Sequence, residues 1–286
     1  MTFMLQKVSD EGTSDPFYAR LWFGIFQLRD TTLQFGKTQD ELEKACQSFD
    51  QLYKPILEAT SAARTSTKEV QRLISDHRAK LSQGTIIRLQ SNTFELSESI
   101  DKPLRDKLAD FLVNGVIALK GIQTVVQPFD IDIGCLYQKP NKFEQGIADL
   151  RATGHPLLAE YLVGARKAWT EQFIERRNSL EHGGWTLSRV EYTFRSADSA
   201  EMNEPQVDKL SISSYCATML NRVMGFVENI IVYAFRHVLK TSMMPLVIVE
   251  IPVPQRERSN PQRFRLDIKN PAVVEWDIKF SETDFV

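Results

Sequence analysis

"HPLLAEYLVGARKAWTEQFIERRNSLEHGG", residues 155–184, is the stretch that predicts the fold most clearly. His155-Pro156 is typical of a helix start, and Gly183-Gly184 of a helix end. Between them, apolar residues recur at three- and four-residue steps and form one stripe. The stripe consists of Leu158, Leu162, Ala165, Trp169 and Phe173. The stretch therefore predicts a long amphipathic helix that packs against other helices and ends in a polar segment.

The composition is that of an ordinary globular chain. Of its 286 residues, 42% are hydrophobic and 25% are charged, which allows one large domain or two smaller ones. The net charge of −2 gives no global basic field, so any nucleic-acid contact must come from a local patch. The three cysteines are far apart, which argues against a disulfide framework or a zinc site and favours a reducing, cytoplasmic location. The sequence shows no secretory signal, and no apolar run of about 18 residues predicts a membrane span.

Residues 1–98 are predicted as an N-terminal helical region. Helical patterns cover residues 15–30, 37–60 and 66–82, and Asp15 is a candidate N-cap for the first. One face of the second pattern carries Leu42, Cys46, Phe49, Leu52 and Tyr53. Gly84 ends this part, and the segment after it fits either a short strand or the start of another helix.

Residues 99–245 are predicted as a helical bundle that contains the opening stretch. Residues 101–129 form one long helical pattern, which Pro128 stops. Residues 131–143 are predicted as a loop because they contain Gly134 and Pro140. Residues 207–240 are predicted as a long and mostly buried helix.

Strand patterns occur at two places. Residues 188–196 alternate polar and apolar side chains and predict a strand, followed by a polar loop at 197–206. Residues 246–286 are predicted as a C-terminal β extension, a small antiparallel sheet formed by the segments 245–254, 263–269 and 273–280. One face of the last two segments carries Phe264, Leu266, Ile268, Val274, Trp276, Ile278 and Phe280. The fold class is therefore mainly α, with a small β element at the C-terminus.

The polar end of the opening stretch brings together Arg177, Asn178 and His182. RNA is cleaved without a metal when its own 2′-hydroxyl attacks the adjacent phosphorus, which requires a proton acceptor, a proton donor and a cation for the phosphoryl charge. Histidine performs either proton transfer near neutral pH, and the planar guanidinium of arginine fits phosphate oxygens. If RNA is the substrate, His182 would act as general acid or base and Arg177 would stabilise the phosphoryl charge. Asn178 shares a helix face with His182 and is expected to orient the imidazole.

Helix geometry limits what one copy of this segment can do. Arg177 and His182 lie about 140° apart around a straight helix, so both cannot reach one phosphate from its centre. Either the helix unwinds near Gly183, or a second subunit completes the site.

"RRNSLEHGG", residues 176–184, at the end of an amphipathic helix, resembles the signature of the HEPN superfamily, an arginine, a polar residue and a histidine four to six residues after the arginine. Arg177, Asn178 and His182 match these positions, and the resemblance covers roughly residues 100 to 245. It implies a HEPN-like helical bundle, pairing of two protomers into a homodimer, and metal-independent endoribonuclease activity on RNA. It also implies a context of defence or a toxin–antitoxin pair, with an antitoxin or regulatory protein as a possible partner. The strand pattern after the motif is a departure from a minimal four-helix core.

Two other interpretations of the motif stay open. The first is that the segment only ends a helix, because basic residues followed by glycines are common at helix C-termini. A second Arg-x4-His pair, Arg72 and His77, lacks the asparagine and the glycine and is interpreted as coincidence. The rival function is a non-catalytic HEPN-like module that binds RNA, a nucleotide or a protein partner. Arg177 and His182 exposed in a shared dimer cleft would favour the enzyme. Arg177 paired with a glutamate of its own chain would favour the binding module.

The most basic segment lies between the two C-terminal strand patterns. It is interpreted as a solvated hairpin tip, and its arginines are the first candidates for RNA backbone contacts outside the cleft. The expected RNA-binding residues are Arg176, Arg256, Arg258, Arg263 and Arg265. The remaining histidines have no metal-ligand spacing, and there is no glycine-rich phosphate loop. The sequence therefore predicts neither a metal nor a cofactor.

Overall fold

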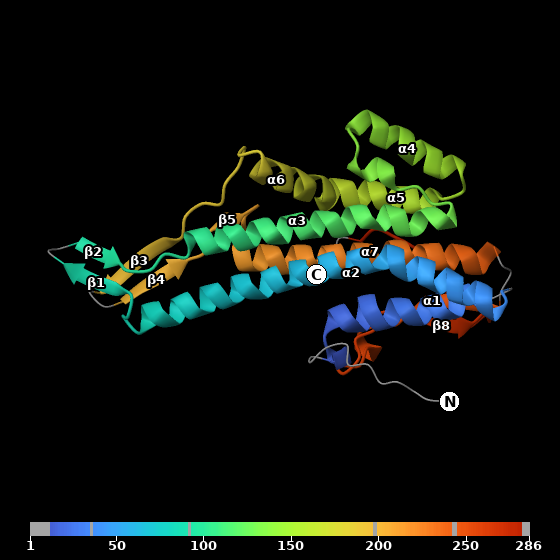
Figure 1. Cartoon of the computed structure of the whole chain (residues 1–286), viewed down its shortest axis with the longest axis horizontal. Helices are drawn as coiled ribbons and strands as arrows, with labels where there is room; N and C mark the ends of the chain where they lie inside the picture. The colour runs from blue at the N-terminus through green and yellow to red at the C-terminus, as the bar shows by residue number, and fades with distance from the viewer. Residues whose placement is uncertain (1–11, 35–36, 91–92, 197–198, 242–244, 282–286) are drawn as a thin grey trace. The chain divides into compact units, whose positions relative to one another are not determined.

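The computed structural model describes residues 12–34, 37–90, 93–196, 199–241 and 245–281. It is a helical bundle with short antiparallel strand pairs, so the predicted mainly α fold class is confirmed (Figure 1). Contacts divide the described chain into two compact units. Unit 1 combines residues 12–58, 118–168 and 224–281, and unit 2 combines residues 59–117 and 169–223. The division at residues 98 and 245 follows sequence pattern rather than contacts and stays a prediction.

Three long helices contribute residues to both units, namely α2 (Gln39–Ser82), α3 (Asp101–Val126) and α7 (Ile212–Thr241). The other helices of unit 1 are a 3₁₀ turn (Gly12–Ser14), a π-helix (Phe17–Gly24), α1 (Ile25–Leu33), 3₁₀ turns (Gln127–Phe129, Gly134–Tyr137), α4 (Pro140–Ala152) and α5 (Pro156–Ala165). Within its described residues the strand pair is β7 (Leu246–Glu250) with β8 (Phe264–Ile268), and a 3₁₀ turn (Val253–Gln255) lies between them. The Cα partners run from Leu246 with Ile268 to Glu250 with Phe264.

Unit 1 has an apolar core that encloses a small polar network. The buried Tyr53 hydroxyl donates to the carbonyl oxygen of Leu21 at 2.7 Å. Two buried polar residues interrupt the apolar face of α7. Glu228 Oε2 accepts from Arg20 Nε at 2.9 Å, and Asn229 Oδ1 accepts from Arg263 at 2.9 Å. These bonds offset the cost of removing the polar groups from water.

Unit 2 contains α6 (Glu171–Glu181) and three strand pairs. A π-helical turn (Arg166–Thr170) precedes α6. The pairs are β1 (Ile87–Gln90) with β2 (Thr93–Leu96), β3 (Glu191–Ser196) with β4 (Ser199–Asn203), and β5 (Gln206–Val207) with β6 (Leu210–Ser211), all antiparallel. The Phe94 and Phe194 rings stack with centroids 4.0 Å apart, which joins the first two pairs.

α6 packs against α3 through its apolar stripe. Trp169 and Phe173 are buried as the stripe predicts, and the Phe173 ring contacts Phe111 edge-on at 5.9 Å. Gly115 makes this approach possible, since a Cβ there would lie 2.6 Å from Phe173 Cζ. The helix predicted at 155–184 is thereby confirmed as α5, the π-turn and α6 in succession.

One described helix, Asp101–Phe129, is long and apolar enough to cross a membrane by length and composition. Half of its most apolar window is buried inside the protein. A core helix of a helical bundle passes the same test, and the packing of α3 on α6 is of that kind.

Several elements differ from the predictions. The patterns at 37–60 and 66–82 form the single helix α2. The predicted loop at 131–143 contains a 3₁₀ turn, and Pro140 is the first residue of α4 rather than a breaker. The predicted polar loop at 197–206 contains β4, because its residues pair with β3. The segment after Gly84 forms the β1–β2 pair, which settles the alternative between strand and helix.

The C-terminal segment 273–280 is not a ladder strand, although it alternates. Trp276 N donates to the carbonyl oxygen of Ile248 at 2.8 Å, and Ile278 is buried. Val274 is 86% exposed, so the predicted apolar face is incomplete. Glu275 and Asp277 instead form ion pairs with Arg236 at 3.0 and 2.7 Å. These ion pairs help to hold residues 273–280 against the protein, because this segment is not part of the β7–β8 ladder. Ile268, predicted on the same face, is 65% exposed at the end of β8.

Candidate functional site

The motif lies at the C-terminal end of α6, where the glycines close the helix. His182 is the C-cap residue, and Gly183 has a φ of 72°, the left-handed conformation that glycine adopts without steric cost. Gly184 N then donates to the carbonyl oxygen of Ser179 at 2.8 Å, which satisfies one of the free carbonyl groups at the helix end. The helix end predicted from the glycines is confirmed, and it places His182 at the C-cap of α6, just before the chain turns away.

Arg177 is held within its own chain. Its NH1 lies 2.5 Å from Glu181 Oε2 and donates to Asn178 Oδ1 at 3.1 Å. The arginine side chain is 25% exposed and that of Glu181 is 48% exposed. A partly exposed pair at i and i+4 contributes only about 0.3–0.5 kcal/mol, so a phosphate can compete with the carboxylate for the guanidinium.

His182 is exposed, and its side chain has no hydrogen bond or ion pair among the described residues. The expected bond from Asn178 to its imidazole is not formed, and Asn178 Oδ1 accepts from Arg177. The main chains do connect, since His182 N donates to the Asn178 carbonyl oxygen at 3.0 Å. In this arrangement Asn178 positions the arginine rather than the histidine.

Arg176, expected to contact RNA, is largely used by the fold. Its guanidinium lies over the Trp185 ring, 4.5 Å from the centroid, and forms an ion pair with Asp208. Asp208 and Lys209 are the two residues between β5 and β6, and both have positive φ, 50° and 69°. This tight turn presents the Asp208 carboxylate to α6. Trp185, just beyond the glycines, therefore anchors the helix end.

The arginines of the C-terminal segment do not form one basic surface. Arg263 is 5% exposed and bonds Glu250 and Asn229, so it cannot make the expected RNA contact in this structure. Arg256 is half-buried, and its Nε donates to the Ile251 carbonyl oxygen at 2.8 Å. Arg258 and Arg265 are exposed, and Arg265 lies 3.5 Å from Asp267. Their role in RNA binding stays a prediction.

Two other histidines are buried and bound to tyrosines. His77 Nε2 lies 2.9 Å from the Tyr192 hydroxyl, and His155 Nδ1 lies 2.9 Å from the Tyr233 hydroxyl. Burial lowers the pKa of both imidazoles. The described residues contain no cluster of three or more His, Cys, Asp or Glu side chains suited to a metal ion.

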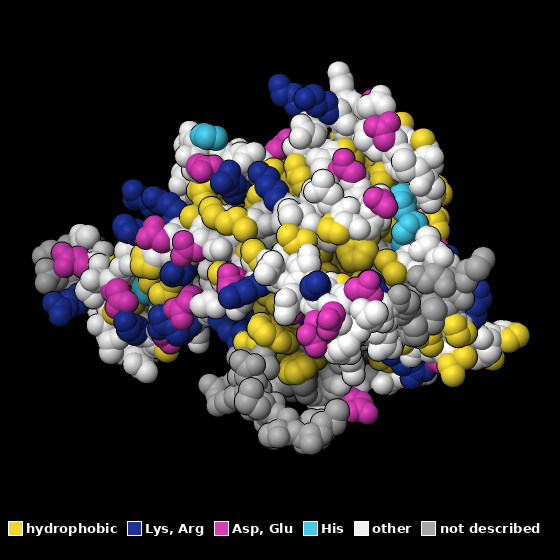
Figure 2. Space-filling view, turned by 45° about the vertical axis from the view of Figure 1, so that its right-hand side comes forward, with side chains coloured by type: hydrophobic (Ala, Val, Ile, Leu, Met, Phe, Trp, Pro, Cys, Tyr) yellow, Lys and Arg dark blue, Asp and Glu magenta, His cyan; other side chains and the backbone are white. Residues whose placement is uncertain are grey.

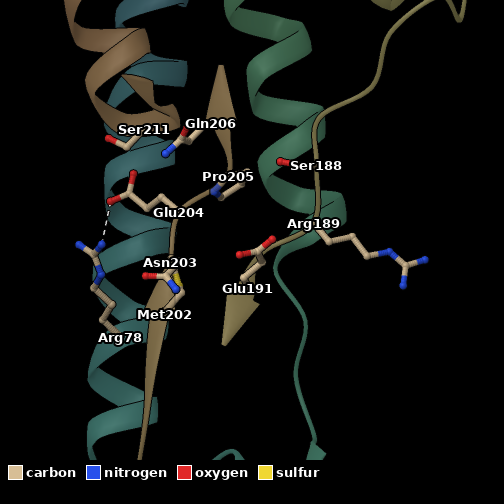
Figure 3. A pocket seen from close by; sticks show the side chains of 10 residues that line it. All are labelled: Arg78, Ser188, Arg189, Glu191, Met202, Asn203, Glu204, Pro205, Gln206 and Ser211. Carbon is tan, nitrogen blue, oxygen red and sulfur yellow. Dashed lines mark hydrogen bonds and ion pairs between the residues drawn. The ribbon is translucent and has the colours of Figure 1, made fainter. Parts of the chain in front are cut away.

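A polar pocket of 720 Å³ lies in unit 2, at the end of the β3–β4 ladder (Figure 3). The last ladder pair is Glu191 with Asn203, and beyond it the two chain segments diverge. We call this cavity the strand-end pocket. It is lined by Arg78, Ser188, Arg189, Glu191, Met202, Asn203, Glu204, Pro205, Gln206 and Ser211. The sequence gives no signal for this pocket, because it forms only where β3 pairs with β4, and residues 197–206 were predicted as a loop.

On the face in Figure 2, lysines and arginines are interspersed with aspartates and glutamates. Comparison with known proteins adds no assignment, since no protein-family model, no curated protein and no solved structure matches the chain.

Proposed function

We propose that the chain is a metal-independent endoribonuclease with a HEPN-like site at the end of α6. His182 serves as general acid or base, and Arg177 stabilises the charge on the phosphoryl oxygens. The 2′-hydroxyl of the RNA attacks the adjacent phosphorus and the 5′-oxygen leaves, which gives a cyclic phosphate without a bound cofactor.

One observation carries this proposal, namely that His182 is exposed at the capped C-terminal end of α6, the helix that also contains Arg177. An imidazole used for proton transfer must be reachable by RNA, and a buried, bonded histidine such as His77 is not. One histidine supplies only one of the two proton-transfer groups. The proposal therefore includes a homodimer in which a second copy supplies the other.

The second candidate is a non-catalytic module that binds RNA, a nucleotide or a protein partner. The Arg177–Glu181 pair favours it, because an arginine neutralised in its own chain is less available to a transition state. Glu181 is exposed, so phosphate binding can still displace it. The two candidates thus differ in the effect of breaking the Arg177–Glu181 pair, which should maintain or increase RNA cleavage only if the chain is an enzyme.

Cleavage of a mixed RNA pool in EDTA tests the proposal. Wild-type protein is compared with Arg177→Ala, His182→Ala and Glu181→Gln. Arg72→Ala is the matched control, because Arg72 is also a helical arginine paired with an acidic residue four positions later, Asp76, at 2.9 Å. We expect cleavage by wild type and Arg72→Ala, loss in the Arg177 and His182 variants, and equal or faster cleavage by Glu181→Gln.

Other outcomes are equally informative. RNA binding without cleavage by folded, dimeric wild type would support the non-catalytic module. Cleavage that persists in both Arg177→Ala and His182→Ala would show that the motif only ends a helix, or that the nuclease is a contaminant.

A further inference from the structure

The strand-end pocket has walls from two diverging chain segments and one helix. Ser188, Arg189 and Glu191 lie on one side, and residues 202–206 lie on the other. In Figure 3 the Ser188 hydroxyl points toward the opposite segment and the Glu191 carboxylate lies in the space between the two segments, whereas the Arg189 guanidinium points outward. Pro205 and Met202 are buried and contribute apolar lining. The pocket therefore combines apolar lining with an inward carboxylate, and Arg189 lies beside it with its guanidinium turned outward.

The charges of the pocket are partly compensated inside the protein. Glu204 Oε1 accepts from Arg78 at 2.9 Å, and Glu204 Oε2 accepts from Ser213 N at 3.2 Å. Arg189, Glu191 and Gln206, in contrast, have no side-chain hydrogen bond or ion pair within the described part of the chain. One positive and one negative group thus remain for a ligand.

A ligand that uses both groups carries N–H donors at one end and an anion at the other. A nucleotide unit has this form, with its base edge as donor and its phosphate as anion. Among the four RNA bases, only guanine presents two adjacent N–H groups on its Watson–Crick edge, which is what the two oxygens of one carboxylate accept. The amide of Gln206 adds both a donor and an acceptor to the same pocket.

We infer that the strand-end pocket binds one unpaired guanosine unit of a single-stranded RNA, with Glu191 on the base and Arg189 on the phosphate. This inference rests on the proposed function, since the same RNA is taken to pass the end of α6. Six residue steps join His182 to Ser188, so their Cα atoms are at most about 22 Å apart. A short single strand can span that distance.

Binding of two fluorescent probes tests the inference. Each probe is a short single-stranded run of 2′-O-methyl uridines with one central 2′-O-methyl guanosine or 2′-O-methyl adenosine. No nucleotide of the probe then has the free 2′-hydroxyl that cleavage needs. Arg189→Ala is expected to weaken both probes about tenfold, the effect of losing one charge-assisted hydrogen bond. Glu191→Gln is expected to abolish the preference for guanosine and leave the adenosine probe unchanged. Arg151→Ala, an exposed arginine in unit 1, is the matched control and should change neither.

Each remaining outcome decides against the inference. Equal binding of the two probes by wild type, or unchanged binding by Arg189→Ala, would overturn it. Competition by free guanosine monophosphate as tight as that of the guanosine probe would mean that the pocket takes a free nucleotide rather than RNA. Cleavage is measured separately on unmodified RNA. Loss of cleavage in His182→Ala with an unchanged guanosine preference in Glu191→Gln would therefore refute the pocket alone, and the reverse pattern the nuclease alone.

Discussion

Arg176 and Arg177 are neighbours in sequence, yet the fold uses them differently. The guanidinium of Arg176 lies between an indole ring and the carboxylate of Asp208, and its Nε is buried. Arg177 keeps only a partly exposed pair with Glu181. Breaking the more enclosed Arg176 pair costs more, since the partner left behind would lose its compensation away from water. Arg177 is therefore the arginine that a phosphate can recruit, and Arg176 the one that holds the helix end.

The two buried histidines predict a specific pH dependence of stability. Burial lowers the pKa of His77 and His155 below the ordinary value of about 6.5, so the unfolded chain binds protons at a pH where the folded chain does not. The free energy of unfolding should therefore fall as pH drops below about 6.5, with a slope of up to about 1.4 kcal/mol per pH unit for each histidine.

Denaturant unfolding at several pH values measures this slope. His77→Gln keeps a group that can bond the Tyr192 hydroxyl but cannot be protonated, so the slope should be smaller in this variant. His155→Gln should reduce it again in the double variant, because the two histidines lie in different units and are expected to act independently. An acid slope that is the same in wild type and the double variant would contradict the assignment.

At the scale of single residues, local rules predicted the position of the motif but not the contacts of its side chains. His182 and Gly183 end α6 because capping depends on residues close in sequence. The burial of Arg263 was not predictable in that way, since its partners Asn229 and Glu250 come from other segments of the chain. The same holds for Arg176, whose partner is 32 positions away.

At the scale of elements, the predictions were correct where an apolar stripe was long. They were wrong where strand pairing or a proline determined the structure. The α5–α6 stripe and the long helix α3 were predicted because their periodicity repeats over many turns. Pro140 was interpreted as a breaker, although proline is equally suited to the first turn of a helix, where its missing N–H costs nothing. β4 carries polar residues and becomes a strand only because β3 lies beside it.

The packing of α6 on α3 predicts that one methyl group will disturb the candidate site. Gly115→Ala places a Cβ 2.6 Å from Phe173 Cζ, so α6 must shift or the ring must leave its position. Overpacking of this kind costs about 1–3 kcal/mol. We expect lower unfolding free energy and, at equal folded protein, weaker RNA cleavage, because the shifted helix carries Arg177 and His182.

Gly121→Ala is the matched control for that variant. Its Cβ would lie 2.8 Å from Ile56 Cγ1, in unit 1, and would overpack the same helix α3 away from Phe173. Thermal unfolding should show a comparable loss of stability, whereas cleavage by the folded fraction should match wild type. Equal loss of cleavage in both variants would mean that the site responds to stability in general and not to the position of α6.

At the scale of the whole molecule, the two units are assembled from segments that are far apart in sequence. Unit 2 alone joins residues 59–117 to 169–223. A sequence read from one end to the other suggests consecutive domains, since composition and periodicity are local. The lining of the strand-end pocket is an example, because Arg78 and Glu204 form a hydrogen bond although they are 126 positions apart in the sequence.

The need for a second copy gives the last prediction. Each chain contributes one exposed imidazole at the motif, while metal-free RNA cleavage requires both a proton acceptor and a proton donor. Excess His182→Ala chain should therefore inhibit wild type, because mixed dimers lack one of the two imidazoles. Cleavage is measured with RNA in large excess over total protein, so that the variant cannot act by sequestering RNA. Arg151→Ala chain in the same excess keeps both motif residues and should not inhibit. Cleavage per wild-type chain that is unaffected by His182→Ala would show that one copy performs the chemistry alone.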